Sequence, residues 1–365
     1  MITHSRISLA RRRRAMSKKA LADSIGVTPN TILRYEVGDI VPSDENLEKI
    51  ANCLGFPKSF FDGNEFDEPR RDNASFRGMS SKSARTMDAA LASGAIAFML
   101  DDWIAKSYHR PEPDVPDYRQ IEPHMAAMLL RQHWGLGIKP IANMVHLLEL
   151  KGIRVFSLAE STKDVDAFSL WRDDIPYVFL NRFKSPERSR FDAAHELAHL
   201  CLHKHGGANA EHPGDSIEKD ANSFAGAFLM PETDVRAVVG RPLYSVNDLA
   251  EYKKRWRVSV SALNYRLREL EIISESKSVS NYVEMSRRGW LKTEPYAIKR
   301  EQSSILQDII NDLLSIGITK TKIASELLVP PTEIEALLFG LANMTSIDGS
   351  GAQSNRGKVK LRLVK

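Results

Sequence analysis

Apolar residues follow one pattern in the first 62 positions and another beyond position 120. In the first stretch they recur at the three- and four-residue spacing of short amphipathic helices, separated by glycine and proline. Ser17 and Thr28 precede two of these helices as N-cap residues, and Gly26 and Gly38 follow them as helix stops. The pattern predicts a helical domain over residues 1–62.

The next segment, residues 63–119, combines turn-rich ends with a helical centre. Its first part, GNEFDEPRRDN, is charged and rich in turn formers, and its last part, PEPDVPDYR, is rich in proline. Residues 80–108 contain few helix breakers. We therefore expect a linker that carries one helical segment.

From residue 120 onward, strands occur among the helices. Three runs are rich in β-forming residues, namely IRVFSL, DAFSLW and PYVFLN. Helical patterns follow them, including residues 186–203 and 216–229. The sequence thus predicts a mainly α protein with a small β-sheet (α+β), whose central domain covers residues 120–295. A helical C-terminal region, residues 296–345, and a loose polar tail, residues 346–365, complete the chain.

Composition limits the classes of function. The 365 residues carry a net charge of +4 and only two cysteines, Cys53 and Cys201. A disulfide framework is therefore excluded, and a cytoplasmic location is expected. No run of about 18 apolar residues occurs, and the basic N-terminus lacks the apolar core of a secretory signal, so no membrane association is expected. Any nucleic-acid surface must be local, and positive charge concentrates in the run Arg11–Arg14.

The pentapeptide HELAH at residues 195–199 has the HExxH pattern of zinc peptidases. A helix of about 3.6 residues per turn places His195 and His199 on one face, where both imidazoles reach one tetrahedral Zn²⁺. Glu196 lies beside the first histidine and is expected to act as general base toward a water at the metal. Because the pattern also occurs by chance on solvated helices, a third ligand is needed to support it.

A second predicted helix offers this ligand. In EKDANSFA, Glu218 and Asn222 are spaced i,i+4 and share a face, while Asp220 is a competing carboxylate. The helix resembles the third-ligand helix of thermolysin-like zincins, in which a glutamate binds zinc and a polar residue four places on orients the ligands. The resemblance implies Glu218 as the third ligand, in preference to Asp220, and Asn222 as the orienting residue.

Several segments, in this order, resemble the ImmA/IrrE family of metallopeptidases. They are FSLW, PYVFLN, RSRFDAAHELAHLCLH and EKDANSFAGAFLMP, followed by DLAEYKKRWRVSVSALNYRLRELEII and RRGWLKTEP, within about residues 70–295. The family implies a zincin fold with a small sheet packed on the HExxH helix, and zinc-dependent endopeptidase activity. Its better understood members cleave helix-turn-helix repressors, which implies a repressor or another regulatory protein as substrate.

Three further histidines follow the motif in sequence. His203, His205 and His212 are expected to be polar loop residues or a cap on the HExxH helix. One of them could instead stabilise the oxyanion of a tetrahedral intermediate. Cys201 lies off the ligand face and is expected to be a small buried residue.

Residues 6–55 resemble the XRE/Cro family of helix-turn-helix domains. The matching residues are SKKALA, IGV and TILRYE, continued by Gly38, Pro42 and Leu47. The resemblance implies a recognition helix in the major groove of DNA. The residues expected at the DNA are Lys18, Thr28, Asn30, Thr31 and Arg34. Lys18, where the family often has glutamine, would contact phosphate, and the run of four arginines would add non-specific attraction. A helical protein-interaction module is the alternative.

A second helix-turn-helix-like pattern occurs near the C-terminus, in ITKTKIASELLVPPTEIEALLF. Ala324, Leu327 and Val329 are placed as in such a motif, but its second helix is acidic because of Glu333 and Glu335. A role in protein binding or packing is therefore expected here, in preference to DNA contact.

Together these features predict a transcriptional regulator with DNA-binding and zinc-endopeptidase domains on one chain. The expected partners are a double-stranded DNA operator, bound by a homodimer, and a repressor or toxin-type protein. Two alternatives remain open, a transcription factor whose zinc domain is a non-catalytic sensor and the antitoxin of a toxin–antitoxin pair. Glu196 favours catalysis, since binding of zinc does not need it.

Overall fold

The N-terminal domain consists of short helices joined by capped turns. They are α1 (His4–Arg13), α2 (Lys18–Ile25), α3 (Pro29–Val37), α4 (Asp44–Leu54) and the 3-10 helix η1 (Lys58–Asp62). Ser17 and Thr28 accept N-cap hydrogen bonds, and Gly26 and Gly38 end α2 and α3 in the left-handed conformation. This computed structural model describes residues 2–70, 74–75, 83–158, 165–203, 214–239, 245–343 and 362–363. The predicted helix boundaries in this domain are confirmed.

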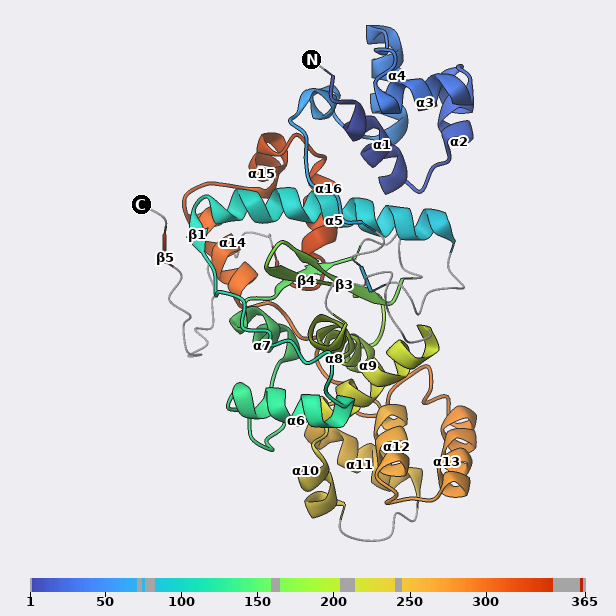
Figure 1. Ribbon diagram of the computed structural model, residues 1–365, viewed down its shortest axis with the longest axis vertical. Helices are drawn as coiled ribbons and strands as arrows, with labels where there is room; N and C mark the ends of the chain where they lie inside the picture. Colours follow the sequence, from blue (N-terminus) through green and yellow to red (C-terminus); the bar gives the residue numbers. More distant parts are fainter. Residues whose placement is uncertain are drawn as a thin grey trace.

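A small sheet lies in the middle of the molecule (Figure 1). Its strands are β2 (Arg154–Ser157), β3 (Ala167–Arg172) and β4 (Ile175–Leu180), in the order β2-β4-β3. β4 is parallel to β2 and antiparallel to β3, with which it forms a hairpin. β3 is therefore an edge strand of this sheet, and an isolated bridge joins its Leu170 to Ala74.

The side chains of the sheet alternate between two hydrophobic clusters, as the two-residue period of a strand requires. Phe156, Phe168, Leu170, Tyr177 and Phe179 belong to the first cluster, which also contains the N-terminal domain. On the opposite face, Val155, Ala167, Trp171, Val178 and Leu180 belong to the second cluster. The sheet thus separates two helical layers and contributes to the core of each.

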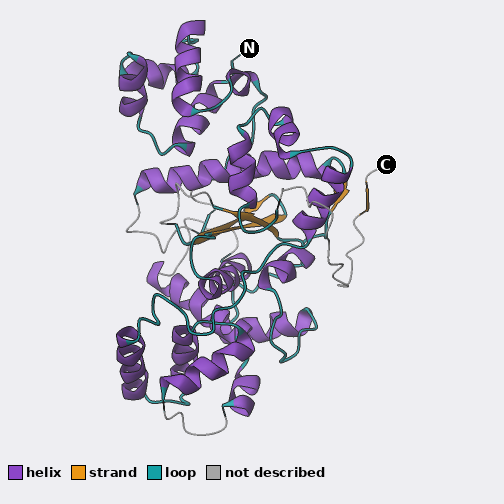
Figure 2. Cartoon of the chain, turned by 180° about the vertical axis from the view of Figure 1, so that it is seen from behind, coloured by secondary structure: helices purple, strands orange, loops and turns teal. Residues whose placement is uncertain are grey.

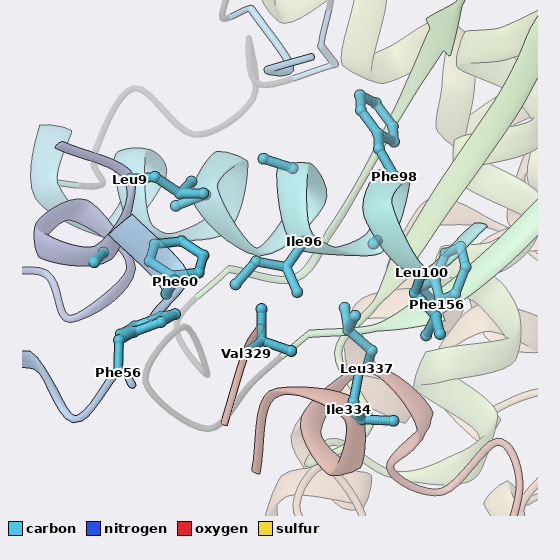
Figure 3. Packing of buried hydrophobic residues seen from close by; sticks show 14 of the residues in the cluster. Leu9, Phe56, Phe60, Ile96, Phe98, Leu100, Phe156, Val329, Ile334 and Leu337 are labelled. Atoms are coloured by element: carbon cyan, nitrogen blue, oxygen red, sulfur yellow. The ribbon is translucent and has the colours of Figure 1, made fainter. Parts of the chain in front are cut away.

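The first layer combines helices from distant parts of the chain. It contains α5 (Ala84–Ala105), α14 (Ile305–Ser315), α15 (Lys320–Glu326) and α16 (Pro331–Leu338). Figure 3 shows Ile96 of α5 beside Val329, which lies in the turn between α15 and α16, with Phe60 of η1 close by. The stretches predicted as a linker with one helix and as a separate C-terminal region therefore share one core with the N-terminal domain and the sheet.

The second layer lies on the other side of the sheet from α5 (Figure 2). Its helices are α6 (Pro123–His133), α7 (Met144–Leu150), α8 (Pro186–Leu202), α9 (Gly214–Leu229), α10 (Glu232–Val238), α11 (Val246–Trp256), α12 (Val260–Glu269) and α13 (Glu275–Arg287). A buried ion pair links α11 to the start of α8, with Lys253 Nζ 3.1 Å from Glu187 Oε1. The predicted α+β class is confirmed.

A last strand pair involves the C-terminal tail. β5 (Arg362–Leu363) pairs antiparallel with β1 (Tyr108–His109). The tail was expected to be loose, and this expectation is wrong at these two positions because the backbone groups of β1 accept a strand. Residues 346–361 lie outside the described residues. None of the described helices is both long enough and apolar enough to cross a membrane.

Candidate functional site

Two histidines converge on one face of α8. Ser185 caps this helix, and small buried residues, Ala194 and Ala198, let it pack closely against the layer around it. The one-turn spacing brings His195 Nε2 within 3.1 Å of His199 Nε2. The imidazole of His199 is almost fully buried, whereas that of His195 borders a cavity.

Glu218 of α9 completes a group of three ligand-type side chains. Its carboxylate oxygens lie 3.2 Å from His195 Nε2 and 3.5 Å from His199 Nε2. One possible ligand atom from each of the three residues lies within 4.8 Å of the ligand atoms of the other two. Among the described residues, Asp220 is not part of such a group. Of the two carboxylates considered from sequence, the structure therefore brings Glu218 to the histidines.

The other ring nitrogens of the histidines face polar partners. His195 Nδ1 lies 3.1 Å from Asn222 Oδ1, one turn beyond Glu218 on α9. His199 Nδ1 lies 3.2 Å from Nδ1 of His203, which is the C-cap residue of α8. Both contacts fix the orientation of a ring whose Nε2 points at the site. His203 thus caps the helix, as one of its expected roles, and His205 and His212 lie outside the described residues.

Electrostatics at this group reflect the close approach of opposite charges. Burial alone would raise the pKa of the Glu218 carboxyl, but hydrogen bonds from His195 and His199 hold it well below its usual range. Burial opposes the charged form of His195, yet the hydrogen bond to Glu218 and the charge of Glu196 raise its pKa overall. Two imidazole nitrogens and a carboxylate form a donor set that suits a tetrahedral Zn²⁺ with one open position.

The carboxylate of Glu196 contacts two serine hydroxyls. Its Oε2 accepts hydrogen bonds of 2.7 Å from Ser75 Oγ and from Ser169 Oγ of β3. The side chain is buried, with 3% of the residue exposed. Sequence reasoning missed both serines. Ser169 had a signal, as the one hydroxyl in the apolar strand DAFSLW, whereas nothing in the sequence marked Ser75.

A cavity of about 130 Å³ adjoins the three side chains. Burial raises the pKa of Asp192 in its wall to about 6, against the charge of Arg188, which lowers it. The cavity is lined by Ser75, Asp166, Ala167, Arg188, Phe191, Asp192, His195, Glu196, Glu218 and Asn222. Cys201, also on α8, is fully buried as expected, and burial raises the pKa of its thiol.

The residues predicted to contact DNA lie around the turn between α2 and α3. Thr28 accepts a hydrogen bond from Thr31 N, so its side chain serves the helix as a cap. Asn30 and Arg34 are exposed on α3. Lys18, at the first position of α2, has a side chain that is 41% exposed, with Nζ 3.9 Å from Glu36 Oε2.

The basic run of α1 forms ion pairs within the fold. Non-specific attraction to DNA was expected from Arg11–Arg14, but all four guanidinium groups pair with acidic side chains of the protein. Arg11 pairs with Glu36, Arg12 with Glu68, and both Arg13 and Arg14 with Glu333. Ion pairing within the fold reduces the charge that these arginines can offer to phosphate, and the attraction to DNA stays a prediction. The expected packing role of the acidic helix near the C-terminus is confirmed at Glu333.

Comparisons with known proteins match two separate parts of the chain. Residues 7–61 match a family model described as helix-turn-helix, and residues 148–268 match one described as IrrE N-terminal-like domain, a peptidase family. The radiation response metalloprotease IrrE of Deinococcus radiodurans is 33% identical over 112 residues. The alignment covers 27% of this chain and only 34% of that protein. The chain therefore carries an N-terminal segment similar to helix-turn-helix domains and a central segment similar to the IrrE N-terminal-like peptidase domain.

Proposed function

We propose that this protein is a DNA-binding regulator whose IrrE-like domain is a zinc-dependent endopeptidase acting on a repressor or another regulatory protein. The observation that carries the proposal is the convergence of His195, His199 and Glu218, whose ligand atoms lie within 4.8 Å of one another. The similarity to a metalloprotease supports the same chemistry. The helix-turn-helix domain supports an action on DNA.

The residues divide the work of peptide hydrolysis between them. His195, His199 and Glu218 would hold the zinc, and Asn222 would keep the His195 ring in place. Zinc in such a site polarises a carbonyl and lowers the pKa of water. Glu196 would take a proton from the attacking water at a carboxylate oxygen and pass it to the leaving amine. Because Ser169 holds Oε2, the other oxygen is the one that remains for this transfer.

Metal content tests the ligand assignment. Purified protein is expected to hold about one zinc per chain, and His195→Ala and His199→Ala to lose it, because a three-ligand site does not tolerate the loss of one ligand. Glu218→Ala should weaken zinc binding far more than the matched Asp220→Ala. If Asp220→Ala were the more damaging variant, Glu218 would not be the ligand.

A pair of variants separates an endopeptidase from a non-catalytic sensor. Glu196→Gln should keep zinc, because Glu196 is not a ligand, but lose cleavage of helix-turn-helix repressors from the same genome by about 10²–10⁴-fold. If the protein acts as an endopeptidase, Glu196→Gln and His199→Ala should lose transcriptional regulation equally in a reporter assay. Loss of regulation in His199→Ala alone would instead support the sensor.

A further inference from the structure

A short piece of the chain lies on the edge strand beside the metal-binding group. Ala74 pairs antiparallel with Leu170 of β3, and Ser75 N donates a hydrogen bond of 3.0 Å to Ser169 O. In return, Ser169 N donates to Ser75 Oγ at 2.8 Å. Both backbone groups of Ser169 are therefore occupied by one residue that is 94 positions away in sequence.

The same residue reaches the proposed catalytic carboxylate. Ser75 Oγ donates to Glu196 Oε2 at 2.7 Å, and Ser75 lines the cavity together with His195 and Glu218. Ala74 is 6% exposed and packs in the first hydrophobic cluster. The contact thus combines backbone pairing, a buried small side chain and a hydroxyl directed at the site, which are the interactions that an extended peptide makes when it adds to a sheet edge.

Resting on the proposed function, we infer that Ala74–Ser75 is an internal strap that occupies the place of an extended substrate on β3. A peptide that pairs with Ser169 must displace Ser75, because the N–H and C=O of Ser169 are both engaged. The strap also defines the class of segment that fits: extended, with a small side chain facing the sheet cluster and a small hydroxyl-bearing residue facing Glu196. Proteolysis of other chains then depends on release of the strap.

Two ion pairs anchor the chain just before the strap. Arg172 of β3 pairs with Asp67 at 2.5 Å, and Arg12 of α1 pairs with Glu68 at 2.5 Å. The second pair ties the chain at Glu68 to the N-terminal domain. A displacement of that domain, such as one imposed by a bound partner, would therefore act directly on Glu68, which precedes the strap in sequence.

A peptide-binding measurement tests the strap without any need for hydrolysis. The probe is a fluorescein-labelled peptide with the sequence of residues 70–80, RRDNASFRGMS, titrated with full-length protein while anisotropy is recorded. A tethered segment competes at an effective concentration on the order of mM, so wild type should bind the probe weakly. Ser75→Pro removes both the N–H and the hydroxyl of the strap and should bind at least about tenfold more tightly.

Controls make the result specific. Ser75→Ala keeps the backbone pairing and should give a smaller gain, which covers the case in which Ser75→Pro fails to fold. Ser5→Ala removes a comparable serine–glutamate hydrogen bond, from Ser5 Oγ to Glu65, far from the site, and should bind like wild type. Equal affinity in wild type and both Ser75 variants, or failure of well-folded Ser75→Pro to bind the probe, would overturn the strap.

The outcome is independent of the outcome for the proposed function. Absence of zinc-dependent cleavage in both wild type and Ser75→Pro, together with tighter probe binding by Ser75→Pro, would reject the endopeptidase and keep the strap. Cleavage of repressors at the same rate by wild type and Ser75→Pro would keep the endopeptidase and reject the strap. Cleavage of the chain within residues 70–80 would make this segment a substrate in cis and would also overturn the inhibitory role.

Discussion

Two helix-turn-helix arrangements, α2–α3 and α15–α16, share their local structure but differ in what covers them. Ser17 caps the first helix of one pair and Thr319 that of the other. Each turn contains one residue with positive φ, 76° at Gly26 and 59° at Leu328. Apolar residues at matching positions are buried in both pairs: Leu21, Ala22 and Ile32 in the first, and Ile323, Ala324 and Ile334 in the second.

The second helices face different surroundings. In α3, Asn30 and Arg34 are exposed. In α16, Glu333 is 2% exposed and forms ion pairs with Arg13 at 2.7 Å and Arg14 at 2.6 Å. The same local motif therefore leaves one helix free to enter a groove of DNA and fixes the other against α1. The sequence motif specifies the turn, whereas the role of the second helix depends on the residues packed against it.

Removing the ion pairs that Glu333 of α16 forms with Arg13 and Arg14 should lower the stability of the protein more than any other substitution considered below. Glu333→Ala removes the carboxylate that pairs with the buried guanidinium of Arg13, and loss of one partner of a buried pair costs about 3–5 kcal/mol. We expect a loss of that size in the free energy of unfolding, measured by urea denaturation of the full chain. Glu335→Ala is the matched control, because its ion pair with Lys320 is exposed and should contribute less than about 1 kcal/mol. Similar losses in both variants would contradict the buried pair.

A second prediction concerns the attachment of the C-terminal helices through α14. Glu149 of α7 accepts hydrogen bonds from Ser303 Oγ and Ser304 N, and burial raises its pKa from 4.5 to about 7 despite these bonds. Between pH 4.5 and pH 7, the folded state therefore keeps a proton on Glu149 that the unfolded state has lost. The contribution of protonated Glu149 to the free energy of unfolding is complete below pH 4.5 and is lost as the pH rises through 7.

Glu149→Gln removes this titration. The free energy of unfolding of wild type, relative to the variant, should fall by on the order of 3 kcal/mol between pH 4.5 and pH 7.5. Urea denaturation at several pH values measures this difference. Glu284→Gln, which removes an exposed ion pair with Arg288, is the control. Its free energy of unfolding should depend on pH as that of wild type does. A difference that stays constant with pH would show that Glu149 titrates normally.

Features that depend on one helix period were predictable, and contacts between distant segments were not. The i,i+4 spacing of His195 and His199 determined their shared face before any tertiary contact was known. Glu218 and Asn222 follow the same rule on α9. The period of α8 aligns the two histidines, and the period of α9 aligns Glu218 with Asn222. The site then forms when the two helices pack side by side.

Ion pairs across the fold follow no such local rule. Arg13 and Glu333 are 320 positions apart, and the sequence did not show that the run of arginines has acidic partners. Ser75 reaches Glu196 across 121 positions, through a backbone pairing with β3 that depends on the final arrangement of the sheet. The net effect of a charge or hydroxyl is set by its partner, which sequence periodicity does not specify.

The exposed helix α3 gives a third prediction. Arg34→Ala and Asn30→Ala should reduce the discrimination between DNA sites by about 1–3 kcal/mol each, because bidentate base contacts carry specificity. Sites selected from a random DNA library with the full chain, followed by salt-dependent affinity measurements, provide the test. Lys18→Ala should instead lower affinity evenly across sites and reduce the salt slope by about one. Unchanged site preference in both α3 variants would remove this helix from the interface.

The smallest effect is expected at the turn that the two motifs share. Gly26 adopts φ of 76°, and an added Cβ would meet no atom within 4 Å, so Gly26→Ala changes only the backbone energy. A non-glycine residue in this conformation costs about 1–2 kcal/mol, and asparagine less. Gly26→Ala should therefore lower the free energy of unfolding by about 1 kcal/mol, and Gly26→Asn should lower it by less. Leu328 already adopts this conformation in the C-terminal motif. If Gly26→Ala had no effect, the N-terminal turn would tolerate a side chain as readily as its C-terminal counterpart.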